Sequence, residues 1–319
     1  MERKRLITGI HHITALAGGT QQNVDFYSGI LGLRLVKKTV NFDAPEVYHF
    51  YYGDETGTPG SILTFFPYNG LSRGRHGKGM LNTTTFSVPV GSEAYWIDRL
   101  KKFQINFKSP QERFEGETVI YFEDQDGLGL ELVFNDKDER KGFERGPVPP
   151  EYAIKGFYNA EIWEEGYERT GGLLTAQMDH KLIAEKGNRF RFAAQNSPGN
   201  FIDILCMPNS MKGLGGSGTV HHLAFATPDA ATQIEVREKI LRSMLNPTPV
   251  IDRDYFTSVY FREPGGVLFE IATAGPGFTV DEDELHLGEQ LRLPKHYEPH
   301  RDIIEKVLEP VKIDYNVWK

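Results

Sequence analysis

Short stretches of alternating apolar and polar residues run along most of the chain, and segments with helical periodicity interrupt them at regular intervals. Residues 7–17 read as a strand, and residues 21–30 carry apolar side chains at the spacing of one helix face, with Thr20 as the expected N-cap. Three short strands are expected next, over residues 33–40, 48–52 and 61–66. The first part of the chain therefore predicts one unit of order βαβββ.

The same order of elements recurs three times. The second unit opens with residues 81–88 and a helix over 92–103, the third with 154–163 and a helix near 167–174, and the fourth with 219–227 and a helix over 229–244. In every unit a glycine precedes the last strand and a distinctive residue lies four positions on, in the pairs Gly60 and Thr64, Gly127 and Glu131, Gly199 and Asp203, and Gly266 and Glu270. The pattern predicts an α+β protein of four βαβββ modules.

The modules are expected to fall into two halves. Residues 136–150 are charged and end with three prolines, which is typical of a linker. We therefore expect an N-terminal half over residues 1–145 with modules one and two, and a C-terminal half over 150–275 with modules three and four. Residues 276–319 begin with an acidic, loop-like stretch and should form a tail with a short helix near 300–308.

Composition narrows the choice of partners. The 319 residues include 36 Lys and Arg against 44 Asp and Glu, a net charge of −8, which argues against nucleic acid as a partner. The longest apolar run falls short of the ~18 residues that a membrane span needs. The single cysteine, Cys206, cannot form an internal disulfide, and no secretion signal is expected at the N-terminus. These features favour a cytoplasmic globular protein with no membrane partner, and they are compatible with a homo-oligomer.

Two His-His pairs open the first and the fourth module. Neighbouring strand residues point to opposite faces, so one histidine of each pair can reach a shared cavity. Leu223 and Phe225 should pack against a helix, which leaves His222 on the open face. The same phase selects His12 in the first pair. His11 and His221 are expected to face away and to act as supporting residues.

A third metal ligand is needed, and Glu270 is a carboxylate within an apolar strand. It could instead form an ion pair with Arg253 or Arg262. Pairing module one with module four brings His12, His222 and Glu270 together, and Thr64 takes the remaining position. Two histidines and one carboxylate form the facial triad of non-haem Fe(II) oxygenases. Zinc, nickel or manganese could occupy the same ligands in purified protein, because such a set selects weakly among divalent metals.

The modules, the two His-His openings and the closing segment over residues 262–273 together resemble the vicinal-oxygen-chelate superfamily. More narrowly, residues 9–278 resemble its hydroquinone-type ring-cleaving dioxygenases, including the methylhydroquinone-resistance proteins. The resemblance implies two glyoxalase-like barrel domains. It also implies Fe(II) on His12, His222 and Glu270, which agrees with the alternation argument. Supporting roles are implied for the side chains of His11, Thr14, His221, Arg253 and Tyr260.

The resemblance implies that a small aromatic substrate and dioxygen meet at the metal, and that the ring of a hydroquinone-like or catechol-like compound opens. Detoxification of quinones and hydroquinones, or aromatic degradation, would be the setting. Two alternatives share the fold. A glyoxalase-type isomerase with zinc or nickel would need a fourth protein ligand, and Thr64 is a poor one. A binding or resistance protein for aromatic compounds would not need the histidine pairs.

Overall fold

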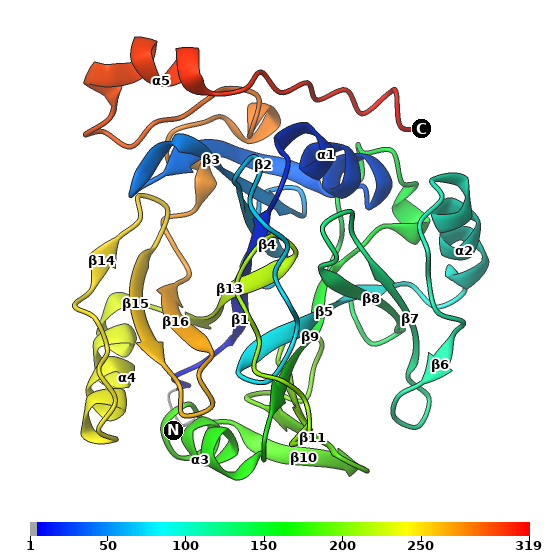
Figure 1. Ribbon diagram of the computed structural model, residues 1–319, viewed down its shortest axis with the longest axis vertical. Helices are drawn as coiled ribbons and strands as arrows, with labels where there is room; N and C mark the ends of the chain where they lie inside the picture. Colours follow the sequence, from blue (N-terminus) through cyan, green and yellow to red (C-terminus); the bar gives the residue numbers. More distant parts are fainter. Residues whose placement is uncertain (1–4) are drawn as a thin grey trace.

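The computed structural model describes residues 5–319 and contains the four predicted modules in the predicted order (Figure 1). The first module consists of β1 (Gly9–Ala17), α1 (Thr20–Val24), the π-helical turn η1 (Asp25–Ile30), β2 (Arg34–Asn41), β3 (Ala44–Gly53) and β4 (Ile62–Pro67). The predicted helix over 21–30 is therefore real but changes type at Asp25. The N-cap prediction was wrong, because Gly19 occupies that position and the Thr20 hydroxyl donates to Asn69 instead.

The other three modules follow the same plan. The second contains β5 (Met80–Val88), α2 (Glu93–Lys102), β6 (Gln111–Glu112), β7 (Thr118–Glu123) and β8 (Gly129–Phe134). After the turn η2 (Pro150–Tyr152), the third contains β9 (Gly156–Glu164), α3 (Glu168–Gln177), β10 (Lys181–Lys186), β11 (Arg189–Ala193) and β12 (Phe201–Cys206). The fourth contains β13 (Thr219–Thr227), α4 (Ala230–Arg242), β14 (Ile251–Asp252), β15 (Thr257–Arg262) and β16 (Leu268–Thr273).

The strands form two curled eight-stranded sheets. The first has the order β14-β15-β16-β13-β1-β4-β3-β2, and the second has the order β10-β11-β12-β9-β5-β8-β7-β6. Modules one and four thus share a sheet through the antiparallel pair β1 and β13, and modules two and three share the other through β5 and β9. The predicted pairing of module one with module four is confirmed. Each half of the sequence contributes to both sheets, so residues 136–150 join two modules of one sheet.

The connectors between modules one and two and between modules three and four bind each other. Arg75 and Leu214 exchange backbone hydrogen bonds of 2.8 and 2.9 Å. The Lys78 N–H donates to the Met211 carbonyl, and the Lys78 carbonyl accepts from the Gly213 N–H, each at 3.0 Å. The backbone of the connector over residues 72–79 is held in place by these bonds.

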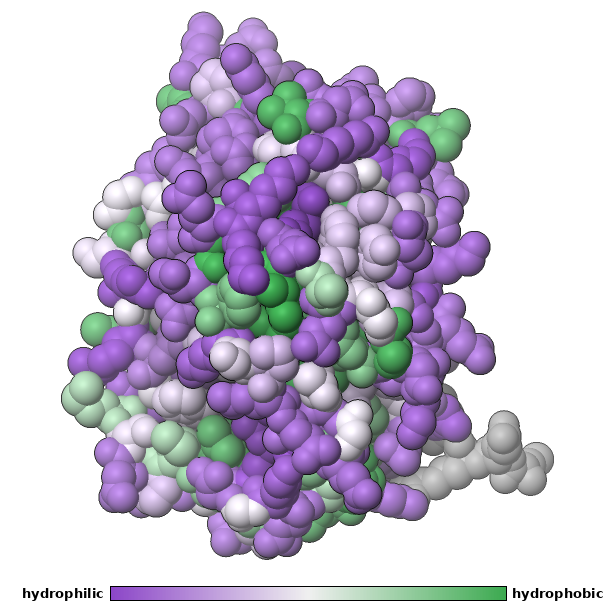
Figure 2. Space-filling model, turned by 90° about the vertical axis from the view of Figure 1, so that its right-hand side faces the viewer, coloured by the Kyte–Doolittle hydropathy of each residue, from purple (hydrophilic) through white to green (hydrophobic). Residues whose placement is uncertain are grey.

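The C-terminal tail lies along β2 and β3 and includes η3 (Phe278–Val280), η4 (Glu284–His286), η5 (Glu298–His300) and the predicted short helix α5 (Arg301–Val307) (Figure 1). The buried Lys37 ammonium on β2 holds it by ion pairs to Asp281 and Glu282. None of the helices within residues 5–319 combines the length and apolar character that a membrane crossing requires. The face drawn in Figure 2 is mostly hydrophilic, and hydrophobic surface shows chiefly in one central hollow.

Candidate metal centre

The two His-His pairs meet where β1 and β13 lie side by side. The register between these strands shifts at His11 and again at His221, so each of these residues is the extra one of a β-bulge. Strict alternation predicts that they face away from the cavity. Each bulge turns its histidine ring toward the next one, with Nδ1 to Nδ1 distances of 2.9 Å for His11 and His12 and 2.8 Å for His221 and His222. The expectation was therefore wrong for His221, which lines the cavity, whereas His11 lies away from the cavity lining.

The predicted ligand residues converge on one point. His12 Nε2 lies 3.1 Å from His222 Nε2. Glu270 Oε2 lies 3.2 Å from His12 Nε2 and 3.0 Å from His222 Nε2. Within residues 5–319, these residues form the one group of three or more His, Cys, Asp or Glu side chains whose ligand atoms come this close. All three are buried.

Hydrogen bonds behind His12 fix which ring nitrogen faces the centre. The carbonyl oxygen of Thr273, 3.1 Å from His11 Nε2, can only accept, so that nitrogen carries the hydrogen. Burial, aided by the neighbouring His12, lowers the pKa of His11 to about 3, so the ring is neutral and its Nδ1 accepts. His12 Nδ1 must then donate to His11. In its neutral form His12 then presents an unprotonated Nε2 to the centre, as a metal ligand requires.

The carboxylate of Glu270 supplies the negative charge. Burial alone would raise its pKa, but His12 and His222 hold the pKa of Glu270 well below the usual value, so it is ionised. Ser258 donates to Oε1 at 2.5 Å. Oε2 is buried and has no hydrogen bond within residues 5–319, although both rings lie close. A buried charged oxygen without a donor is costly, and a cation at this point would remove the cost.

The distances fit one ion. Donor atoms at right angles and about 2.1 Å from a common ion lie about 3.0 Å from one another. The three observed separations run from 3.0 to 3.2 Å. The residues present therefore fit a divalent metal held on one face, with the other side open to a cavity.

That cavity has a volume of about 700 Å³ and lies inside the curl of the first sheet. Its lining is rich in aromatic and aliphatic side chains, and a pocket of this kind suits an apolar aromatic ligand. The lining residues important here are His12, His222, His221, Arg253, Tyr260, Phe256, His49 and Tyr51.

Three of the predicted supporting residues lie at the cavity. Arg253 Nε donates to the Tyr260 hydroxyl oxygen at 3.3 Å, and Tyr260 pairs with Glu270 in the register of β15 and β16. His221 is exposed at the cavity wall. Thr14 does not contact the ligands through its hydroxyl, which instead lies 2.8 Å from the Thr64 hydroxyl. His11 is buried behind His12, away from the cavity lining.

Two residues on β3 were missed by the sequence reasoning. His49 lines the cavity, and its Nε2 lies 3.0 Å from the Thr64 hydroxyl. Burial, with further contributions from His12, His222 and Arg253, lowers the pKa of His49 well below its usual value, so its ring is neutral. Tyr51 lines the same cavity. Alternation along β3 puts both on one face, but alternation alone cannot tell which face meets the metal.

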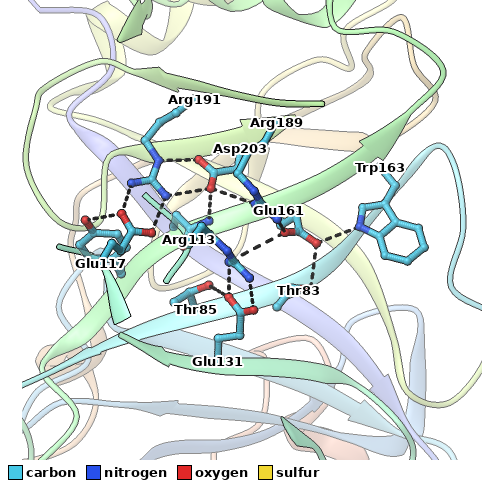
Figure 3. Close-up of polar contacts among 12 residues, drawn as sticks. Thr83, Thr85, Arg113, Glu117, Glu131, Glu161, Trp163, Arg189, Arg191 and Asp203 are labelled. Atoms are coloured by element: carbon cyan, nitrogen blue, oxygen red, sulfur yellow. Dashed lines mark hydrogen bonds and ion pairs between the residues drawn. The ribbon is translucent and has the colours of Figure 1, made fainter. Parts of the chain in front are cut away.

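The second sheet has arginines where the first has ligands. Glu131 pairs with Thr85 on the neighbouring strand as Glu270 pairs with Ala224, so the two glutamates are equivalent. Figure 3 shows Arg113 on Glu131, and Arg189 and Arg191 on Asp203. Arg191 also binds Glu117 with distances of 2.5 and 2.9 Å. Guanidinium groups neutralise these carboxylates, and no histidine is present in the network, which supports a single metal per chain.

We expect Arg191→Met to destabilise the protein strongly, because it leaves the buried carboxylates of Glu117 and Asp203 without their shared cation. Removing one partner of such a buried pair costs about 3–5 kcal/mol. Arg242→Met is the matched control, since the Arg242 side chain is 77% exposed and its ion pair with Glu238 lies on the surface. Urea unfolding measures both. A cost for Arg191→Met no larger than for the control would show that the network contributes little.

Comparison with known proteins places these observations in a family. Residues 9–132 match the model of the Glyoxalase/Bleomycin resistance protein/Dioxygenase superfamily. The chain is 45% identical over 305 residues to MhqO of Bacillus subtilis, which is named as a ring-cleaving dioxygenase, covering 96% of this chain and 97% of that protein. It is 32% identical to the chlorohydroquinone/hydroquinone 1,2-dioxygenase of Sphingobium indicum, covering 98% and 100%.

A solved structure agrees with these sequence relatives. A dioxygenase from Bacillus subtilis superposes with a TM-score of 0.93 at 44% sequence identity, covering 98% of this chain and 99% of that chain. The four modules, their order and the two curled sheets are therefore shared over nearly the whole length.

Proposed function

The chain belongs to the Glyoxalase/Bleomycin resistance protein/Dioxygenase superfamily and, within it, to the ring-cleaving dioxygenases, and on that premise we propose that it opens the ring of a hydroquinone with dioxygen at Fe(II). The ion would be held by His12, His222 and Glu270. The observation that carries this proposal is the convergence of their three buried donor atoms at 3.0–3.2 Å beside an apolar cavity. Removal of hydroquinones, as detoxification or as aromatic degradation, is the role we propose.

Iron(II) in such a site would bind the phenol and dioxygen side by side and pass charge between them. The apolar walls of the cavity would hold the ring and limit the water around it. Burial and the charge of Glu270 raise the pKa of Tyr260, so its hydroxyl stays protonated. Because Arg253 Nε donates to the Tyr260 oxygen, the Tyr260 hydrogen remains free to stabilise developing negative charge on the substrate.

A proton must leave the phenol when it binds. We assign its acceptance to His221 rather than to His11, because only His221 lines the cavity. Burial lowers the pKa of His221 to about 4, so its ring is neutral before the substrate binds. Both nitrogens of His11 are already engaged, with His12 and with the Thr273 carbonyl, and the ring lies behind the ligands. His11 is then a positioning residue that sets the tautomer of His12.

The arrangement supports a dioxygenase over the isomerase alternative. A glyoxalase-type site would need a fourth protein ligand at the position of Thr64. The Thr64 hydroxyl is instead engaged with Thr14 at 2.8 Å and with His49 at 3.0 Å. Three protein ligands leave positions for both the phenol and dioxygen.

The test is oxygen uptake by the iron-loaded protein with a panel of hydroquinones and catechols. We expect uptake with hydroquinones and a ring-opened product. Turnover of a thiol-conjugated aldehyde without oxygen uptake would instead support the isomerase, and binding of the aromatics without turnover would support a resistance protein.

We expect Tyr260→Phe and Arg253→Ala to slow turnover without emptying the metal site. Neither side chain belongs to the proposed ligand set, and the loss of one donor to developing charge costs about 10²–10³ in rate. Iron stoichiometry and steady-state oxygen uptake, measured on the same samples, check this. Full activity in both variants would refute the charge-stabilising role, and loss of iron would mean that the pair supports the site structurally.

A further inference from the structure

Tyr51 and Tyr260 occupy matching positions on opposite arms of the first sheet. Tyr51 on β3 pairs with Thr64 on β4, just as Tyr260 on β15 pairs with Glu270 on β16. The strands β16, β13 and β1, which carry the three proposed metal ligands, lie between these arms. Both tyrosines line the same cavity. The two side chains therefore flank the centre from two sides.

The ring of Tyr51 is fixed and its hydroxyl is free. The ring packs against His49 at a centroid distance of 4.0 Å, against Phe278 at 5.1 Å and against Tyr255 at 6.2 Å, and the residue is 1% exposed. Within residues 5–319 the hydroxyl has no hydrogen-bond partner. The hydroxyl oxygen is accessible to solvent, and because Tyr51 lines the cavity, the hydroxyl opens onto it.

The surroundings keep this hydroxyl protonated. Burial raises the pKa of Tyr51 well above its usual value, and the nearby Tyr260 adds to the rise. The charge of Arg253, which lines the same cavity, opposes the rise, but burial outweighs it. A tyrosine that is buried, held by packing and left without a partner is a donor prepared for a ligand.

We propose that Tyr51 binds the substrate by donating a hydrogen bond to a phenolic oxygen of the diphenol, from the β3 arm and opposite Tyr260. The inference rests on the proposed function, because it takes the substrate to be a diphenol. Tyr51 belongs to module one, whereas the residues proposed above to act on the substrate, Tyr260, Arg253 and His221, belong to module four.

The test compares Tyr51→Phe with Tyr48→Phe in the full-length, iron-loaded protein without oxygen. Tyr48 lies on the same strand but faces the main core, and its hydroxyl donates to the Glu309 carbonyl at 3.0 Å. Unsubstituted hydroquinone is titrated into each protein by calorimetry. Iron content and the urea unfolding midpoint are measured on the same samples, and KM and kcat are measured in air.

The two variants should behave in opposite ways. Tyr51→Phe should weaken hydroquinone binding about 10-fold, as the loss of one hydrogen bond to a ligand does, and should raise KM, while its iron content and unfolding midpoint stay unchanged. Tyr48→Phe should bind hydroquinone normally and lose stability, because its hydroxyl has a partner in the protein.

Two results would overturn the inference while the proposed function stands. One is hydroquinone affinity of Tyr51→Phe within about twofold of the wild type. The other is loss of iron or a lower unfolding midpoint in Tyr51→Phe, which would mean a structural role. Failure of the wild type itself to bind hydroquinone would contradict the proposed function, and the inference would fall with it.

Discussion

Glu270→Ala, His12→Ala and His222→Ala should each purify folded but without metal, and none should consume oxygen with hydroquinone. Each change removes one of three buried donor atoms that lie within 3.2 Å of one another. No other protein group within residues 5–319 is placed to replace it, since Thr64 is engaged elsewhere. The fold should survive because the two sheets and their apolar core do not depend on the ion.

Elemental analysis and urea unfolding measure these effects together. His286→Ala is the matched control, because the His286 side chain is 67% exposed and makes a surface contact with Glu289. It should keep a full complement of metal. Wild-type metal content in any of the three ligand variants would remove that residue from the centre.

The zinc-loaded protein should be inactive toward hydroquinones although zinc fills the same site. Two imidazoles and a carboxylate bind zinc or nickel at least as tightly as Fe(II), so a purified sample can carry the wrong ion. Zinc has no accessible redox change and cannot pass electrons to dioxygen. Oxygen uptake should therefore appear only after the ion is removed and Fe(II) is added without air.

Metal analysis before and after the assay makes this experiment decisive. A verified zinc form that turns over hydroquinone with oxygen uptake would contradict the redox account. If the zinc form instead isomerises a thiol-conjugated aldehyde, a glyoxalase-type isomerase would be the better explanation of the function.

Much of the fold followed from pattern alone. The four βαβββ modules are recognisable because each strand and helix shows its own periodicity. The pairing of modules one and four followed from chemistry, since only that pairing collects two histidines and a carboxylate. The convergence of His12, His222 and Glu270 was anticipated in the same way.

The errors have local physical causes. Alternation failed at His221 because a β-bulge adds one residue to a strand, and one sequence does not reveal where a ladder shifts register. Tyr51 was missed because the cavity-facing side of β3 depends on how the sheet curls. The arginine network of the second sheet, centred on Arg191, depends on contacts between strands that lie far apart in the sequence.

The most direct test of the central claim is the fate of isotope-labelled dioxygen in the reaction of the iron-loaded protein with hydroquinone. We expect oxygen and hydroquinone to be consumed in equal amounts, and a single ring-opened product to carry both labelled atoms. Oxidation of hydroquinone to the quinone without incorporated label, or no oxygen consumption by protein with a verified full load of iron, would contradict the claim.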